Sequence, residues 1–147
     1  MEIKLTDRGN APVRLVACFS EQKPASHHLD ANLTQIIHGV MKREEFSPKF
    51  GTTLVLTPGG DNPRHIILIG LGAVEEFTPE KARRAAGKAL KQAIKLKGDQ
   101  LDINLADFGA AIPPEELGRA ISEGALLAGY KFDKYVSERK DNPVHMV

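Results

Sequence analysis

The segment His65-Ile66-Ile67-Leu68-Ile69 is almost wholly apolar, and it limits the possible folds more than any other part of the chain. A strand without a polar face is covered on both sides, as happens in the centre of a sheet with helices on each face. Shorter apolar or alternating segments predict four further strands, at residues 3–5, 13–19, 52–56 and 101–105.

Two of these strands carry more detailed predictions. The turn sequence Pro-Gly-Gly-Asp-Asn-Pro at 58–63 joins the strand at 52–56 to the apolar strand, which predicts a hairpin with a wide turn. In the segment 101–105, Asp102 and Asn104 alternate with apolar residues, so one face of that strand is expected to be in contact with water.

Three helices are predicted between the strands. The first begins near Asp30, a good capping residue, and ends at Lys42 and Arg43. The second is capped by Thr78 and ends at Lys97-Gly98, with alanines on its buried side. The third opens at residues 113–116, presents a buried stripe of mostly small residues, and is followed by the aromatic segment 130–135. The order β-β-α-β-β-α-β-α predicts an α/β fold with a mixed sheet flanked by helices.

Length, charge and cysteine content limit the classes of protein to which the chain can belong. A length of 147 residues fits one domain, and the net charge of +1 gives no overall attraction to nucleic acid or membrane. No segment has the ~20 apolar residues needed to span a bilayer. The single cysteine, Cys18, lies in an apolar strand and is predicted to be a buried free thiol, which suits a cytoplasmic protein.

Catalytic motifs are absent from the sequence. Gly70-Leu71-Gly72 has Glu75 where a dinucleotide fingerprint needs a third glycine, so a turn with permissive backbone at both glycines is expected. There is no P-loop, nucleophile elbow or His-Glu-x-x-His motif. The five histidines show no zinc-ligand spacing, so we predict no catalytic, cofactor-binding or metal residue; they are His27, His28, His38, His65 and His145.

One surface is a candidate binding site. Five basic residues of the second helix fall within an arc of roughly 80° because they follow one another at steps of three and four. They are Lys81, Arg84, Lys88, Lys91 and Lys95. A solvated helix face is the simpler interpretation, and a nucleic-acid backbone or an acidic partner is the alternative.

Four ordered segments resemble the amino-terminal domain of the leucyl (cytosol) aminopeptidase family. They are Phe50–Leu56, Ile67–Gly72, Thr78–Gly87 and Glu123–Tyr135, the last being the most specific. The resemblance implies a three-layer sandwich similar to macro domains. It also implies that the parent protein is a cytoplasmic homo-hexamer that removes amino-terminal residues from peptides with two divalent metal ions, zinc or manganese.

In that family the metal ligands lie in the carboxy-terminal domain, whose signature Asn-Thr-Asp-Ala-Glu-Gly-Arg-Leu is absent from this sequence. We therefore expect residues 1–136 to form a non-catalytic amino-terminal domain. Residues 137–147 are expected to begin a linker and a further strand leading to a missing catalytic domain, which would be its main partner. Two alternatives stay open: a macro-like module that binds nucleotide or ADP-ribose, and a nucleic-acid-binding domain.

Overall fold

A computed structural model describes residues 2–5, 11–20, 31–59, 63–98, 100–109, 111–136 and 145–146. For residues 2–5, 130–136 and 145–146 it describes the backbone only. The strands are β1 (Glu2–Leu5), β2 (Val13–Phe19), β3 (Thr53–Leu56), β4 (His65–Gly72), β5 (Gln100–Ile103) and β6 (His145–Met146). The helices are α1 (Ala31–Arg43), α2 (Pro79–Lys95) and α3 (Pro114–Val136), with 3-10 turns η1 (Val74–Glu76) and η2 (Leu105–Phe108).

The strands form one mixed sheet in the order β3-β4-β2-β5-β1-β6. β3 runs antiparallel to β4, which confirms the predicted hairpin, and the other neighbours are parallel. The apolar strand β4 is internal, as predicted, between β3 and β2. β1 and β2 are consecutive in the chain but do not pair, because β5 lies between them.

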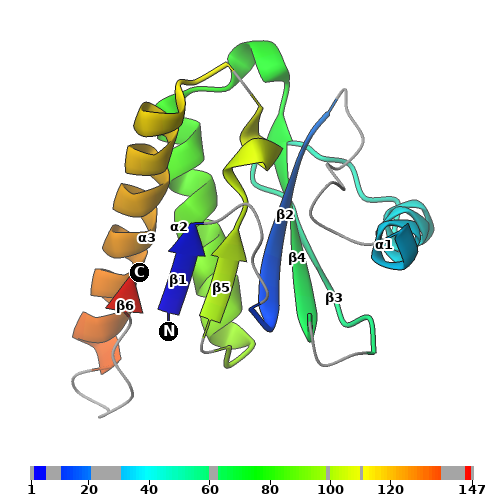
Figure 1. The fold of residues 1–147 in the computed structure, drawn as a ribbon, viewed down its shortest axis with the longest axis horizontal. Helices are drawn as coiled ribbons and strands as arrows, with labels where there is room; N and C mark the ends of the chain where they lie inside the picture. The colour runs from blue at the N-terminus through cyan, green and yellow to red at the C-terminus, as the bar shows by residue number, and fades with distance from the viewer. Residues whose placement is uncertain are drawn as a thin grey trace.

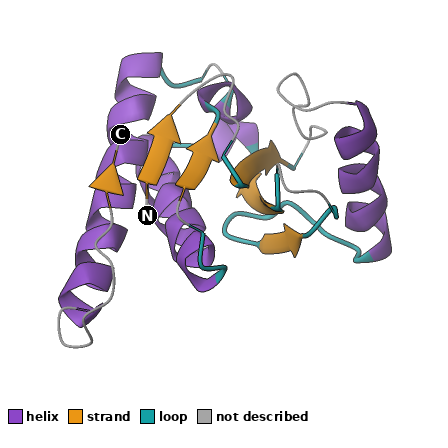
Figure 2. Ribbon diagram, turned by 60° about the horizontal axis from the view of Figure 1, so that its bottom comes forward, coloured by secondary structure: helices purple, strands orange, loops and turns teal. Residues whose placement is uncertain are grey.

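Helices cover both faces of the sheet and give three layers (Figure 1, Figure 2). α1 packs on one face through Ile37, which joins a cluster with Val16 and Leu68. α2 and α3 lie together on the other face, over a larger core that includes Leu15 and Ile67. The odd and even residues of β2 and β4 therefore face opposite layers, which explains why both strands carry apolar residues on both faces, with Arg14 and His65 as the exceptions.

The prediction of a water-facing side for the strand at 101–105 is wrong. Asp102 and Asn104 are each only 5% exposed. β5 is an internal strand, and the buried carboxylate of Asp102 is bonded to the backbone. Its Oδ2 accepts a hydrogen bond of 2.7 Å from the Ala11 amide. Asn104 Oδ1 accepts one of 2.9 Å from Ala106, which caps η2, so Leu105 belongs to that turn and not to the strand. The alternation of polar and apolar residues at 101–105 therefore reflects buried side chains that bond to backbone amides, and not a face in contact with water.

The end of one helix differs from its prediction, whereas the stop predicted for α2 at Lys97 and Gly98 is confirmed. The aromatic segment 130–135 lies inside α3, which continues to Val136, and does not follow it. At the end of α2, Lys97 adopts the left-handed conformation with φ of 57°. Gly98 is required for space, because a Cβ there would lie 2.7 Å from Cγ2 of Val13. Asp30 and the polar segment 137–142 lie outside the described residues.

The strand predicted near the end of the chain is present as β6, which pairs with β1 at the edge of the sheet. Among the described residues, no helix is long and apolar enough to cross a membrane.

Candidate functional site

Helix α2 holds the predicted basic residues on its outer side because its other side is buried. Thr78 caps the helix by accepting a hydrogen bond of 3.2 Å from the Lys81 amide, and Pro79 starts the first turn, as predicted. The buried side consists of small residues and one leucine: Ala82, Ala85, Ala86, Ala89, Leu90 and Ala93. Helical periodicity then leaves the lysines and arginines facing away from the sheet.

Small residues bring α2 and α3 close together. A Cβ at Gly124 of α3 would lie 2.0 Å from the carbonyl oxygen of Arg83, so only glycine fits there. Gly87 of α2 faces the same glycine, since a Cβ at Gly87 would lie 3.3 Å from the Gly124 oxygen. The expected buried stripe of α3 is thus confirmed, and its small residues set the spacing of the two helices.

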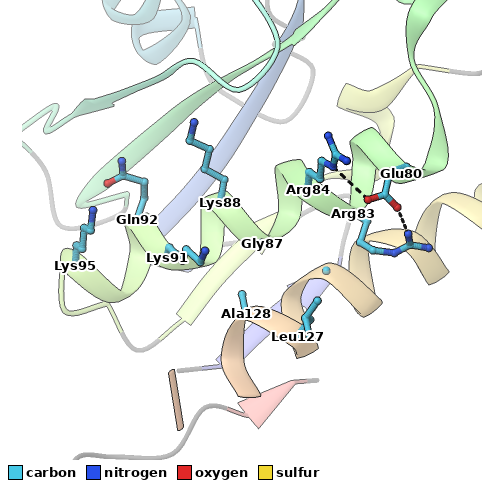
Figure 3. Close-up of a pocket in the computed structure, with 11 residues that line it drawn as sticks. Glu80, Arg83, Arg84, Gly87, Lys88, Lys91, Gln92, Lys95, Leu127 and Ala128 are labelled. Atoms are coloured by element: carbon cyan, nitrogen blue, oxygen red, sulfur yellow. Dashed lines mark hydrogen bonds and ion pairs between the residues drawn. The ribbon is translucent and has the colours of Figure 1, made fainter. Parts of the chain in front are cut away.

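A groove of about 470 Å³ runs along the outside of this helix pair (Figure 3). It is lined by Glu80, Arg83, Arg84, Gly87, Lys88, Lys91, Gln92, Lys95, Gly124, Leu127 and Ala128. Four of the five predicted basic residues therefore line one groove. The fifth, Lys81, is directed elsewhere, with its Nζ 5.5 Å from the centre of the Phe50 ring.

The charges along this groove are neutralised at one end only. Near the start of α2, Glu80 forms ion pairs with Arg83 and with Arg84, the latter at 3.2 Å (Figure 3). Arg83 also bridges to Glu123 of α3 at 2.9 Å, a contact between the helices that the sequence analysis missed. Charge pairs within one helix are signalled by spacing, but a pair forty residues apart has no such signal.

Positive charge remains at the other end of the groove. Lys88 Nζ donates a hydrogen bond to the carbonyl oxygen of Gly51. Lys91 and Lys95 are exposed, and no carboxylate of the described part of the chain lies within ion-pair distance of either. The groove therefore combines an apolar floor with unpaired cations, a chemistry that suits an acidic partner with an apolar side.

The glycine pair after the apolar strand does not form the predicted turn. Gly70 and Gly72 both lie in β4. A Cβ at Gly70 would lie 2.3 Å from the Lys49 oxygen, so this glycine is needed for a close approach of the segment before β3. Gly72 has φ of 75° and does use the permissive backbone. Their amides donate to Thr52 and Pro48 within the chain.

Cys18 is buried, as predicted, and is a free thiol. Its burial, together with the nearby charge of Asp107, raises its pKa to about 12. The thiol is 3.7 Å from the carbonyl oxygen of Ile69, and its high pKa makes it a poor nucleophile.

No three metal-ligating side chains converge among the residues for which side chains are described. His38 lies on α1, and His65 lies at the start of β4 with its Nδ1 3.0 Å from the Thr57 hydroxyl. His27 and His28, and the side chain of His145, lie outside the described part. The described residues do not fit a two-metal site, which needs several converging carboxylates.

Comparison with known proteins identifies relatives of the chain. Residues 15–139 match the amino-terminal domain of the cytosol aminopeptidase family. A probable cytosol aminopeptidase from Clostridium perfringens is 38% identical over 106 residues, which cover 71% of this chain and 21% of the relative. The chain spans about a fifth to a third of the length of the curated relatives that it matches.

Solved structures show the same fold. The bottromycin maturation enzyme BotP superposes with a TM-score of 0.66 at 22% identity over 93% of this chain and 27% of its own. BotP has also been solved in complex with Mn. The macrodomain of Thermus aquaticus DarG superposes with a TM-score of 0.61 at 12% identity, covering 98% of this chain and 95% of that domain. The macro-like α/β architecture is thereby confirmed.

Proposed function

Because this chain belongs to the cytosol aminopeptidase family, as its amino-terminal domain, we propose that it is the non-catalytic part of a metal-dependent leucyl aminopeptidase. The match over residues 15–139 carries the proposal. It is supported by the small share of each relative that the chain spans, since the relatives contain several hundred further residues in which a catalytic site can lie.

The chemistry of the described residues agrees with this division of labour. Hydrolysis of a peptide bond by two metal ions needs carboxylates that hold both ions and a bound water between them. Several described carboxylates instead accept hydrogen bonds from backbone amides, as Asp102 does, or pair with arginines, as Glu80 and Glu123 do, and no three ligating side chains of the described residues converge. Two divalent ions, zinc or manganese, would be held by the catalytic domain of the parent protein, and membership of the aminopeptidase family supports this assignment.

The domain itself would act through its surfaces. We assign it a role in packing against its own carboxy-terminal catalytic domain, in assembly of a homo-hexamer, or in controlling access of peptides to the catalytic site. We further propose a cytoplasmic location, which the names of the relatives support, since they are probable cytosol aminopeptidases.

The structure favours this proposal over the two alternatives, a nucleotide-binding module and a nucleic-acid-binding domain. The glycines that motivated a nucleotide site are used for packing in β4, because Gly70 contacts the segment before β3 and its amide is bonded within the chain. The likeness to macrodomains concerns the fold alone. For nucleic acid, Glu80 neutralises Arg84, and the cations of the predicted stripe that remain in the groove are Lys88, Lys91 and Lys95, which is little charge for a phosphate backbone.

An activity assay tests the proposal. The purified chain is incubated with leucyl-p-nitroanilide and either zinc or manganese, beside the full-length Clostridium perfringens relative as a positive control. We expect hydrolysis by the relative and none by this chain at any metal concentration. Turnover by this chain that is abolished by a chelator would refute its assignment as non-catalytic.

A further inference from the structure

Strand β3 closes the sheet on one side, and no strand of the described residues lies on its outer edge. Its inner edge pairs with β4 (Figure 1). Proteins usually protect an exposed edge with a proline, a charge or a bulge in the strand itself. The strand Thr53–Leu56 has none of these, so nothing within β3 prevents a further strand from pairing with it.

The register of the hairpin shows which backbone groups face this edge. The Gly70 amide donates a hydrogen bond to the Thr52 carbonyl oxygen, and bonded pairs alternate with non-bonded pairs along an antiparallel ladder. The backbone of Leu54 therefore bonds to β4, whereas the amide and carbonyl groups of Thr53 and Val55 point away from β4. Within the described chain these outward groups have no hydrogen-bond partner.

Helix α2 places cations beside the same strand. Gln92 Nε2 donates a hydrogen bond of 3.3 Å to Thr53 Oγ1, and Lys88 bonds to the Gly51 carbonyl oxygen. Lys95 projects from the same side of α2 as these two residues (Figure 3). It lies about 4.5 Å further along the helix than Gln92, beside the second half of β3. Both lysines are exposed, and no carboxylate that the structure describes forms an ion pair with either.

The two side-chain layers beside β3 differ in chemistry. On one side, Leu54 and Leu56 pack in the apolar cluster under α1, which also contacts the partly buried Met41 and Phe46. On the other side lie Thr53 and the two lysines of α2. A strand added at this edge would therefore place alternate side chains against an apolar layer and a basic layer.

We propose that β3 is a docking site for an extended acidic segment of another protein, which adds to the sheet as a further strand. The backbone of the segment bonds to the outward groups of Thr53 and Val55. Its side chains alternate between apolar residues, toward the α1 layer, and acidic residues, toward Lys88 and Lys95. The proposal depends only on β3 and one side of α2, so it stands apart from the aminopeptidase assignment.

The same lysines disfavour other occupants. Two copies of β3 paired across a two-fold axis would bring both α2 helices to one face of the joined sheet, where Lys88 and Lys95 would meet like charges. A nucleic acid would neutralise the lysines, but its phosphates cannot donate to the carbonyl groups of Thr53 and Val55. An acidic peptide strand satisfies both the charges and the backbone.

Peptide binding tests the proposal. The probe is a fluorescent peptide of alternating glutamate and valine, about eight residues long, and fluorescence anisotropy measures its binding to the full 147-residue chain. We expect a dissociation constant on the order of 100 μM at about 50 mM salt, and about tenfold weaker binding at about 500 mM. A peptide of alternating lysine and valine should not bind. The glutamate-valine peptide N-methylated at every residue should bind at least about tenfold more weakly, because it has lost its backbone donors.

Variants of the chain separate the roles of charge and backbone. Lys88→Glu/Lys95→Glu should lose affinity for the glutamate-valine peptide and gain it for the lysine-valine peptide, whereas Arg119→Glu on α3 should change neither. Val55→Pro removes an outward amide and leaves the ladder with β4 intact, so it should weaken binding about tenfold. Circular dichroism shows whether each variant is folded.

Hydrogen exchange followed by NMR locates the bound peptide. In the free chain the amides of Thr53 and Val55 should exchange rapidly and that of Leu54 slowly, and saturating peptide should slow the first two at least about tenfold. Slow exchange of Thr53 and Val55 in the free chain, or no binding at about 2 mM peptide, would overturn the proposal. Equal binding of the N-methylated peptide would also overturn it. Protection of these two amides that rises with chain concentration, without peptide, would assign the edge to a second copy instead.

Discussion

The contact between Gly124 and the backbone of α2 yields a quantitative prediction about stability. In the variant Gly124→Ala the new Cβ would lie 2.0 Å from the Arg83 carbonyl oxygen and 2.8 Å from its carbonyl carbon. Because both atoms are backbone, no side-chain rotation relieves the overlap, and α2 and α3 must separate by about 1 Å. Overpacking of this kind costs about 3 kcal/mol at the upper end of its usual range.

The intrinsic preference of alanine over glycine in a helix offsets about 1 kcal/mol of that cost. We therefore expect Gly124→Ala to lower the free energy of unfolding by about 2 kcal/mol, and the melting temperature by about 4–8 °C. Gly118→Ala is the matched control on the same helix, because a Cβ at Gly118 meets nothing within 4 Å. It should stabilise the chain by about 0.5–1 kcal/mol.

Urea unfolding followed by far-ultraviolet circular dichroism measures both variants against the parent chain. The two substitutions are chemically identical and should change stability in opposite directions. If Gly124→Ala proved as stable as Gly118→Ala, the close approach of the two helices would be wrong, and with it the geometry of the groove.

Two further predictions concern single side chains. The pKa of Cys18 is raised to about 12, so the thiol of the folded chain stays protonated above pH 9, where the thiol of the unfolded chain ionises. The contribution of Cys18 to the free energy of unfolding is therefore fully present below pH 9. It falls by about 1.4 kcal/mol per pH unit between pH 9 and pH 12. Urea unfolding at several alkaline pH values should show this slope in the parent chain and a shallower one in Cys18→Ala. Thr78→Ala removes the cap of α2 and should cost about 1 kcal/mol, whereas Thr78→Ser should be close to neutral; equal losses for both would show that the hydroxyl is not the stabilising group.

Local signals in the sequence predicted most elements of the fold. The capping group Thr78, the following Pro79 and the alanine periodicity located α2, because these interactions occur within one or two turns of the helix. The apolar run of β4 correctly indicated an internal strand for the same reason: a strand covered on both faces has no polar alternation.

Two of the wrong predictions depended on contacts between distant segments. Asp102 is buried because its carboxylate meets the Ala11 amide, a partner ninety-one residues away. Gly70 is a glycine because the carbonyl of Lys49 leaves no room for a Cβ. Rules that use only neighbours in the chain therefore interpreted Asp102 as part of a water-facing side and Gly70 as part of a turn.

The candidate site was predicted in part for the same reason. Spacing along one helix grouped the basic residues, but it could not show that Arg84 pairs with Glu80 or that Lys88 reaches Gly51. The groove itself exists only because Gly87 and Gly124 bring two separate helices together. Which cations stay unpaired therefore depends on tertiary packing, and only the structure identifies Lys91 and Lys95.

The position of β1 in the sheet has a consequence for synthesis on the ribosome. β1 precedes the other described strands in the chain, yet its internal neighbour is β5, and Glu2 pairs with Gln100. β1 therefore cannot pair with β5 until about a hundred further residues have been translated. During that interval β2 has an open edge on the side that β5 will occupy, so the nascent chain stays open to incorrect strand pairing until β5 leaves the exit tunnel.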